Sequence, residues 1–209
     1  MIRIYFLFVV FSFAQICFAQ YDDWSFAEIY LKDGTVLKGQ GRIPITQSGS
    51  KLTMSKEKLR YRVDASGSKK IDPKDIEKIY FNVQPEKGVK TKRVVKGDPK
   101  LFIIIYKNDK KSKLGFAELL IDGKVKLVKR KVKIMSNNMI SEFNEYLFVK
   151  DNGKATVFSK LELKSFKKRA SEFFKDCPSL VKKINKKTFG RRDLIEIAQY
   201  YNANCAKKS

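Results

Sequence analysis

The residues best suited to chemistry in this chain are basic side chains rather than nucleophiles. Positions 123 to 134, GKVKLVKRKVKI, hold six of them alternating with valine, leucine and isoleucine. An extended strand points successive side chains to opposite faces, so this spacing predicts a basic row along one strand. The row is either a surface that docks an anionic partner or the solvated face of a sheet. The candidate anion-binding residues are Lys124, Lys126, Lys129, Arg130, Lys131 and Lys133.

The apolar residues of this stretch change parity along the chain. Val125 and Leu127 occupy odd positions, whereas Val132 and Ile134 occupy even ones. A strand that keeps one face on a core has to slip by one residue to produce this change. We therefore expect a β-bulge, or a break between two strands, near Val128.

Side chains for enzyme catalysis are scarce. The chain has no histidine, which excludes Ser-His-Asp and Cys-His nucleophiles and histidine-bearing zinc sites. Phosphate-loop and dinucleotide glycine patterns are also absent, so we expect no metal and no cofactor. A carboxylate pair would suffice for an extracytoplasmic hydrolase, which is the alternative to a non-enzymatic protein. The candidate carboxylates, each more simply a solvent-facing partner of nearby lysines, are Glu28, Glu118, Glu142 and Glu145.

The first nineteen residues, MIRIYFLFVVFSFAQICFA, resemble an export signal in composition. One early positive charge, Arg3, precedes an apolar run, and the segment ends in small Ala19. The run is shorter than the roughly 20 apolar residues of a spanning helix. Ile16 stands where a lipoprotein signal needs a small residue before Cys17. We expect cleavage after Ala19 and a periplasmic or secreted mature chain without a transmembrane segment.

Charge and export together define the expected partners. The chain holds 45 Lys and Arg against 22 Asp and Glu, a formal net charge of +23. Such a surplus attracts anionic surfaces. For an exported chain we expect no intracellular nucleic acid as a partner, and the candidate partners are lipopolysaccharide, anionic lipid head groups or extracellular DNA. A further alternative is an adaptor that docks another envelope protein through a sheet edge or the helical end.

Removal of the leader leaves two cysteines, Cys177 and Cys205. An even pair in an oxidising compartment predicts a disulfide. Closing the 28-residue separation would stabilise the fold by about 3.5 kcal/mol through the lost entropy of the unfolded chain. A redox pair would need closer spacing, such as Cys-x-x-Cys, so we expect a structural bridge.

Residues 20–158 show a strand and turn pattern. Three sharp turns, Asp33-Gly34, Asp122-Gly123 and Asn152-Gly153, separate alternating segments and predict two-residue hairpins. Residues 101–106, LFIIIY, predict a strand buried on both faces. Asp72-Pro73 predicts a short helical turn with Asp72 as its cap. We expect an α+β protein whose body is an antiparallel sandwich or barrel of about eight to ten strands.

Residues 159–209 change to a period of about 3.6 and predict a cap of three helices. Ser159 and Glu162 form a capping box for the first helix, which Pro178 ends. The second helix is expected from Pro178 to Lys187, and the third follows Gly190. The apolar positions that predict the inward faces are Leu163, Phe166, Ala170, Phe173, Phe174, Cys177, Leu180, Val181, Ile184, Leu194, Ile197, Ala198, Tyr201 and Cys205.

The tail carries a recognisable combination, with FFKDCPSL at 173–180, DLIEI at 193–197 and YYNANC at 200–205. It resembles the tail of a group of uncharacterised exported proteins from flavobacteria-like Gram-negative bacteria. Members of that group also open with a Leu-Lys-Asp-Gly-Thr hairpin, like 31–35 here, and carry a segment like Ile71 to Ile79. The resemblance implies export and a β-rich body with a disulfide-linked helical end, and it implies no activity.

Overall fold

The computed structural model describes residues 24–47, 57–64, 67–84, 97–107, 110, 111, 113–136, 139–151, 153–158 and 165–206. The predicted leader and the predicted Ser159–Glu162 cap therefore lie outside the described residues. The strands are β1 (Ser25–Leu31), β2 (Val36–Arg42), β3 (Thr46–Gln47), β4 (Leu59–Arg62), β5 (Lys69–Ile71), β6 (Ile76–Phe81), β7 (Lys100–Tyr106), β8 (Leu114–Ile121), β9 (Val125–Ser136), β10 (Met139–Lys150) and β11 (Thr156–Val157). The helices are the 3-10 turn η1 (Pro73–Asp75) and α1 (Phe166–Phe173), α2 (Pro178–Asn185) and α3 (Leu194–Asn204).

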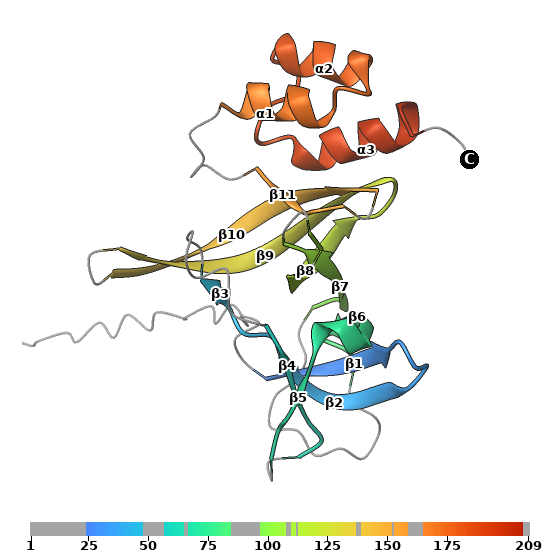
Figure 1. The fold of residues 1–209 in the computed structure, drawn as a ribbon, viewed down its shortest axis with the longest axis vertical. Helices are drawn as coiled ribbons and strands as arrows, with labels where there is room; N and C mark the ends of the chain where they lie inside the picture. Colours follow the sequence, from blue (N-terminus) through green and yellow to red (C-terminus); the bar gives the residue numbers. More distant parts are fainter. Residues whose placement is uncertain are drawn as a thin grey trace, which may run out of the picture.

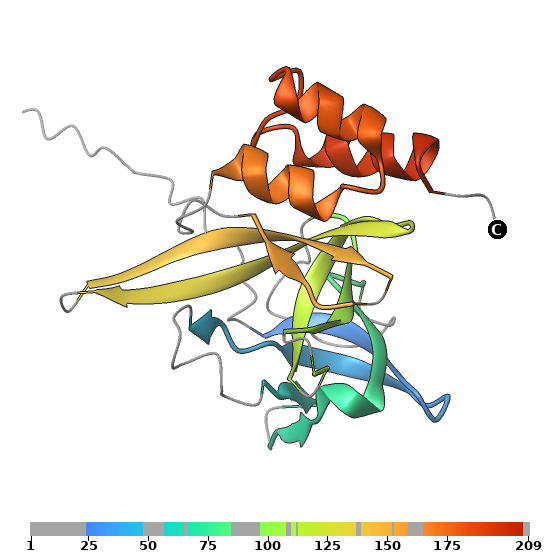
Figure 2. The same cartoon turned by 45° about the horizontal axis from the view of Figure 1, so that its top comes forward.

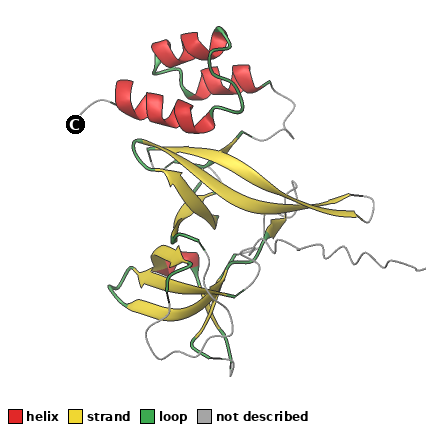
Figure 3. Cartoon of the chain, turned by 180° about the vertical axis from the view of Figure 1, so that it is seen from behind, coloured by secondary structure: helices red, strands yellow, loops and turns green. Residues whose placement is uncertain are grey.

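All eleven strands belong to one sheet, in the order β11-β10-β9-β8-β7-β6-β1-β2-β4-β5, with β3 beside β9 (Figure 1). The pairings are antiparallel except that of β3 with β9. Three helices follow the sheet and lie over its β9–β11 end, and β1, β2, β4 and β5 form the opposite end (Figure 3). The predicted α+β class, with an antiparallel body and a three-helix tail, is confirmed.

The predicted hairpins form, but their turns are not all of two residues. At the first, Tyr30 pairs with Val36, and the Leu31 N–H donates to the Thr35 carbonyl oxygen at 2.9 Å. This leaves a three-residue loop in which Gly34 alone has a positive φ, +88°. A glycine in that conformation is typical of hairpins whose loop has three residues.

Strands β7 to β11 curl until the two ends of this part of the sheet meet. The Ala155 N–H donates to the Tyr106 carbonyl oxygen at 2.8 Å, and Tyr106 forms a parallel bridge with Lys154. The curl agrees with the barrel-like form of the prediction. Figure 2 shows that the β9–β10 hairpin extends beyond this curl as an arm.

Three apolar clusters hold the fold together. The first joins the helices to one face of β9 and β10 and includes Leu127, Phe148 and Phe174. The second lies on β1, β4, β6, β7 and β8, and the third lies on the face of β7–β11 that is turned away from the helices. Strand β7 serves two of them, because Phe102 belongs to the second cluster and Ile105 to the third. The prediction that this strand buries both faces is confirmed at those two residues.

The helical tail follows the predicted period with different ends. Helix α1 begins at Phe166, where the Ser165 hydroxyl accepts a hydrogen bond from the Lys168 N–H at 3.3 Å. It ends at Phe173, before the predicted stop at Pro178. Helix α2 begins at Pro178 as predicted, at a position where no N–H is needed, and ends at Asn185, before the predicted Lys187. Leu180, Ile184, Leu194, Ile197, Ala198 and Tyr201 are buried as predicted.

Polar contacts fix the helices on the sheet. From α3, the Asn202 side-chain oxygen accepts from the Val125 N–H at 2.9 Å, and its amide donates to the carbonyl oxygens of Val125 (2.8 Å) and Asp122 (3.2 Å). A second anchor is Asp176, which binds the Lys150 ammonium and the Tyr201 hydroxyl, both at 2.5 Å. The cap is thereby tied to the β8–β9 turn and to the end of β10.

Candidate functional site

The six basic residues predicted as an anion-binding row do not share one face. Strand β9 pairs with β10 without a shift over twelve residue pairs, from Val125 with Lys150 to Ser136 with Met139. Side chains therefore alternate regularly along β9, with Lys129, Lys131 and Lys133 on the face of Val125 and Leu127. Lys126 and Arg130 point to the other face. The predicted slip within this strand is wrong.

The parity change has a different cause, because the apolar cover moves from one face of β9 to the other. At its start, Val125 and Leu127 are buried under the helices. Val128 belongs to the cluster on the opposite face, and further along Val132 is also fully buried. The irregularity near Val128 is in β8, where Leu120 is the extra residue between Leu119, paired with Val128, and Ile121, paired with Leu127.

Acidic partners neutralise most of the predicted row. Lys129 lies 3.0 Å from Glu118, and the Arg130 guanidinium lies 2.6 Å from Glu145. Three further side chains have ion pairs: Lys131 and Lys133 with Glu142 at 2.6 and 2.9 Å, and Lys126 with Asp122. The hydrogen bonds from Lys131 and Lys133 lower the pKa of Glu142, so it stays ionised. Lys124 is exposed on the β8–β9 turn.

The four candidate carboxylates are each engaged by a basic group, as predicted, but two of them are not solvent-facing. Glu118 and Glu145 are 7% and 5% exposed, and both are ion-paired. Glu28 lies 3.9 Å from the Lys38 ammonium and accepts a hydrogen bond from Tyr30. Within the described ranges, no three His, Cys, Asp or Glu residues are grouped as a metal ion would require.

A buried ion pair that the sequence does not signal joins Glu57 to Lys107. Their charged atoms are 2.8 Å apart, and the side chains are 3% and 6% exposed. Glu57 also accepts from the Phe116 N–H at 3.2 Å. A Cβ on Gly115 would lie 2.9 Å from a Glu57 oxygen, so a larger residue there would have to displace the pair. This group braces β7 against β8 and is too enclosed to meet a ligand.

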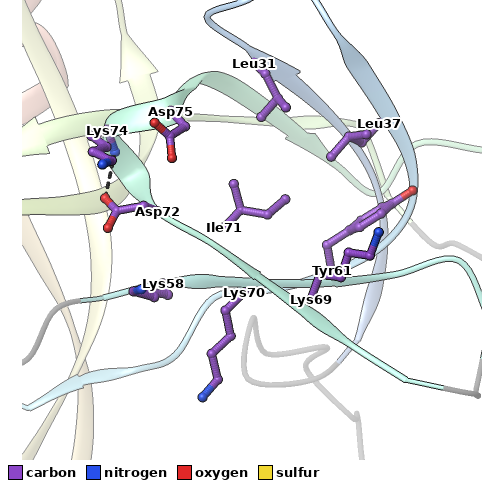
Figure 4. A pocket seen from close by; sticks show the side chains of 10 residues that line it. All are labelled: Leu31, Leu37, Lys58, Tyr61, Lys69, Lys70, Ile71, Asp72, Lys74 and Asp75. Atoms are coloured by element: carbon purple, nitrogen blue, oxygen red, sulfur yellow. Dashed lines mark hydrogen bonds between the residues drawn. The ribbon is translucent and has the colours of Figure 1, made fainter.

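The best candidate for a binding site is an open pocket of about 480 Å³ at the end of the sheet remote from the helices (Figure 4). Its apolar wall consists of Leu31 from β1, Leu37 from β2 and Ile71 from β5, all half-buried and packed against the second cluster. Tyr61 closes one side and donates its hydroxyl proton to the Lys38 carbonyl oxygen at 2.9 Å. Burial raises the pKa of the Tyr61 hydroxyl, which keeps this wall neutral.

Charge around the pocket is predominantly positive. Exposed lysines stand on several elements around it: Lys58, Lys69, Lys70 and Lys74. Two aspartates also line it, and one of them, Asp72, accepts a hydrogen bond from the Lys74 N–H at 3.1 Å as the cap of η1. In the part of the chain that the structure describes, none of these four ammonium groups forms an ion pair. This arrangement differs from the paired row on β9.

The two cysteines are joined as predicted, with 5.6 Å between the Cα atoms of Cys177 and Cys205. Cys177 is fully buried in the helical cluster, which suits a structural bridge. Among the described helices, none has the length and apolar character needed to cross a membrane. Comparison of the chain with protein-family models, curated proteins and solved structures found no match.

Proposed function

We propose that this chain is an exported, non-enzymatic binding or structural protein of the envelope or the extracellular space, with affinity for anionic surfaces. The observation that carries the proposal is the contrast between its two groups of lysines. Those on β9 are held by Glu118, Glu142 and Asp122, whereas those around the pocket have no ion pair in the described ranges. Unpaired ammonium groups on flexible stems retain their charge for an external anion.

The net charge of +23 supports the same proposal. A surplus of this size produces a positive potential over the surface and speeds encounters with anionic polymers and membranes. Such interactions weaken as salt screens the charges, over a Debye length of about 8 Å at physiological ionic strength. The proposed partners are therefore anionic polymers of the envelope, such as lipopolysaccharide, and they should be released by salt.

The test is retention on immobilised heparin and lipopolysaccharide during a salt gradient. The first variant changes the four pocket lysines to glutamine: Lys58, Lys69, Lys70 and Lys74. The matched control removes the same charge from exposed positions of the helical tail: Lys167, Lys168, Lys175 and Lys182. We expect the pocket variant to elute at lower salt than the control. Retention of the native chain no stronger than that of an unrelated protein of equal net charge would refute the proposal.

Export is the second part of the proposal and has an independent test. The predicted leader should be removed after Ala19, leaving Gln20 as the first residue. Mass spectrometry of the protein from its native cells, after fractionation, should find this mature end outside the cytoplasm. An intact Met1 in the cytoplasmic fraction would contradict it.

A further inference from the structure

We infer that the pocket beside β5 binds an anionic amphiphile, a molecule with a phosphate or carboxylate head and an alkyl tail. The inference rests on the proposed function, since both use the pocket lysines, and it adds a defined ligand class and place. It is carried by two properties of the pocket that occur together. These are an apolar wall that the fold leaves open and ammonium groups that stand beside it.

The apolar wall provides the place for the tail. Leu31, Leu37 and Ile71 come from three strands and point into the same space in Figure 4. Their inner sides pack on the second cluster, and each remains partly exposed. The volume of about 480 Å³ lies within the range of small-molecule sites, which are mostly apolar with a few polar groups.

The lysines provide the place for the head. Lys58 and Lys69 lie on the β4–β5 side of the pocket, where the Lys70 ammonium points away from the apolar wall, and Asp75 lies on the opposite side with η1 (Figure 4). Since a carboxylate repels an anionic head, the head should lie on the β4–β5 side. The tail then extends toward Leu31 and Leu37. Lysine stems are long enough for their ammonium groups to follow a head group while covering the apolar wall.

Neither part of the pocket alone would select this ligand class. An anionic polymer would need the lysines and would leave the wall of Leu31, Leu37 and Ile71 exposed to water. A neutral amphiphile would cover the wall and would gain nothing from the ammonium groups. An anionic amphiphile satisfies both, because burial of apolar area and charge-assisted hydrogen bonds contribute together.

The test is calorimetric titration of the mature chain, residues 20–209, with dodecyl phosphate and with laurate below their micelle concentrations. We expect one molecule of either ligand per chain. Inorganic phosphate, dodecyl maltoside and dodecyltrimethylammonium test the head alone, a neutral head and a cationic head, and each should bind at least about tenfold more weakly. Equal binding of the cationic and anionic amphiphiles, or many molecules per chain, would overturn the inference.

Two variants locate the site. Leu37→Asn should weaken dodecyl phosphate binding by about tenfold, because it removes a leucine from the wall. The double variant Lys58→Gln/Lys69→Gln should weaken it by a similar factor without touching the apolar cluster. The control is Val63→Asn, which removes an apolar side chain that is 74% exposed and does not line the pocket. If Leu37→Asn fails to fold, the lysine variant still tests the site, because an unchanged affinity for dodecyl phosphate in that variant would refute it.

Vesicles containing phosphatidylglycerol separate a membrane-bound from a soluble source of the ligand. Binding to vesicles without binding to monomeric dodecyl phosphate would overturn the pocket inference and leave the proposed surface affinity intact. Leu37→Asn should leave heparin retention unchanged, because it removes no charge. If the native chain is not retained on heparin, that result counts against the proposed function instead.

Discussion

Replacement of Asn202 by alanine should lower the free energy of unfolding by about 2 to 3 kcal/mol. Asn202 supplies the hydrogen bonds that a neighbouring strand would otherwise give to Val125, whose N–H and carbonyl oxygen it holds at 2.9 and 2.8 Å. A net hydrogen bond contributes about 1 kcal/mol, and the third bond, to Asp122, is exposed and contributes less. Val125 is fully buried, so its backbone groups have no ready access to water after the change.

Asn202→Asp distinguishes these hydrogen bonds from simple packing. Aspartate keeps the acceptor for the Val125 N–H but places a second oxygen against the carbonyl oxygens of Val125 and Asp122, which lie 2.8 and 3.2 Å from the present amide nitrogen. Two acceptors facing each other leave both without a donor, and the carboxylate adds a desolvated charge. The aspartate variant should therefore be at least as unstable as the alanine variant, although it preserves the side-chain shape.

Gly123 should be energetically coupled to Asn202. A Cβ at Gly123 would lie 2.6 Å from Asn202 Cγ, and its φ of +141° disfavours any L side chain. Gly123→Ala should therefore cost about 3 kcal/mol or more from strain and overlap together. In the double variant with Asn202→Ala the overlap disappears and the backbone strain remains. The two single substitutions together should therefore lower the free energy of unfolding by about 1 kcal/mol or more beyond the loss in the double variant.

Urea unfolding of the disulfide-bonded chain, followed by circular dichroism, measures all four forms of the cycle. The midpoint temperature offers a second readout, at about 2 to 4 °C for each kcal/mol in a protein of this size. Additive effects of the two substitutions would refute the contact between Asn202 and the turn. An Asn202→Asp variant as stable as the native chain would refute the proposed hydrogen-bond directions.

Further predictions concern the Asp176 anchor and the disulfide. Burial opposes the charge of Asp176, but hydrogen bonds from Lys150 and Tyr201 outweigh it and lower its pKa. The contribution of the carboxylate should be complete above the unfolded pKa of about 3.9 and lost as pH falls through the folded value. The difference in free energy of unfolding between the native chain and Asp176→Asn should thus be constant near pH 7 and shrink in acid. A difference that persists in acid would contradict the lowered pKa of Asp176. Joint replacement of Cys177 and Cys205 by serine should cost about 3.5 kcal/mol in urea unfolding, and a loss below about 1 kcal/mol would show that the bridge constrains the unfolded chain little.

The parts of the fold that could be predicted from the sequence depend on local chemistry. Asp-Gly turns and alternating residues mark the hairpins, since a positive φ and a period of two are properties of a few neighbouring residues. The stripe that includes Leu180, Ile184 and Leu194 likewise marks the helices. Element ends were less predictable, because Ser165 caps α1 through a contact that is equally available to other serines.

The parts that could not be predicted depend on contacts between distant segments. A period of two shows that β9 has two faces, but which face the helices cover depends on α3, where Asn202 lies 77 residues beyond Val125. The sequence therefore suggested a slip where the cover changes sides. Glu57 and Lys107, 50 residues apart, form their pair for the same reason. The pocket combines side chains of several strands with η1, and no single segment of the sequence carries its pattern.

The strand order of the sheet bears on how the chain acquires its shape during synthesis. From β7 to β11 each strand pairs with the one made just before it, so pairing can follow the emerging chain. The β1–β2 hairpin is made first, but β1 finds its second neighbour only when Ile76–Phe81 has emerged. In that interval the inner edge of β1 offers unsatisfied backbone groups to any other nascent chain. We therefore expect a chaperone that binds nascent chains to bind mainly at the β1–β2 hairpin.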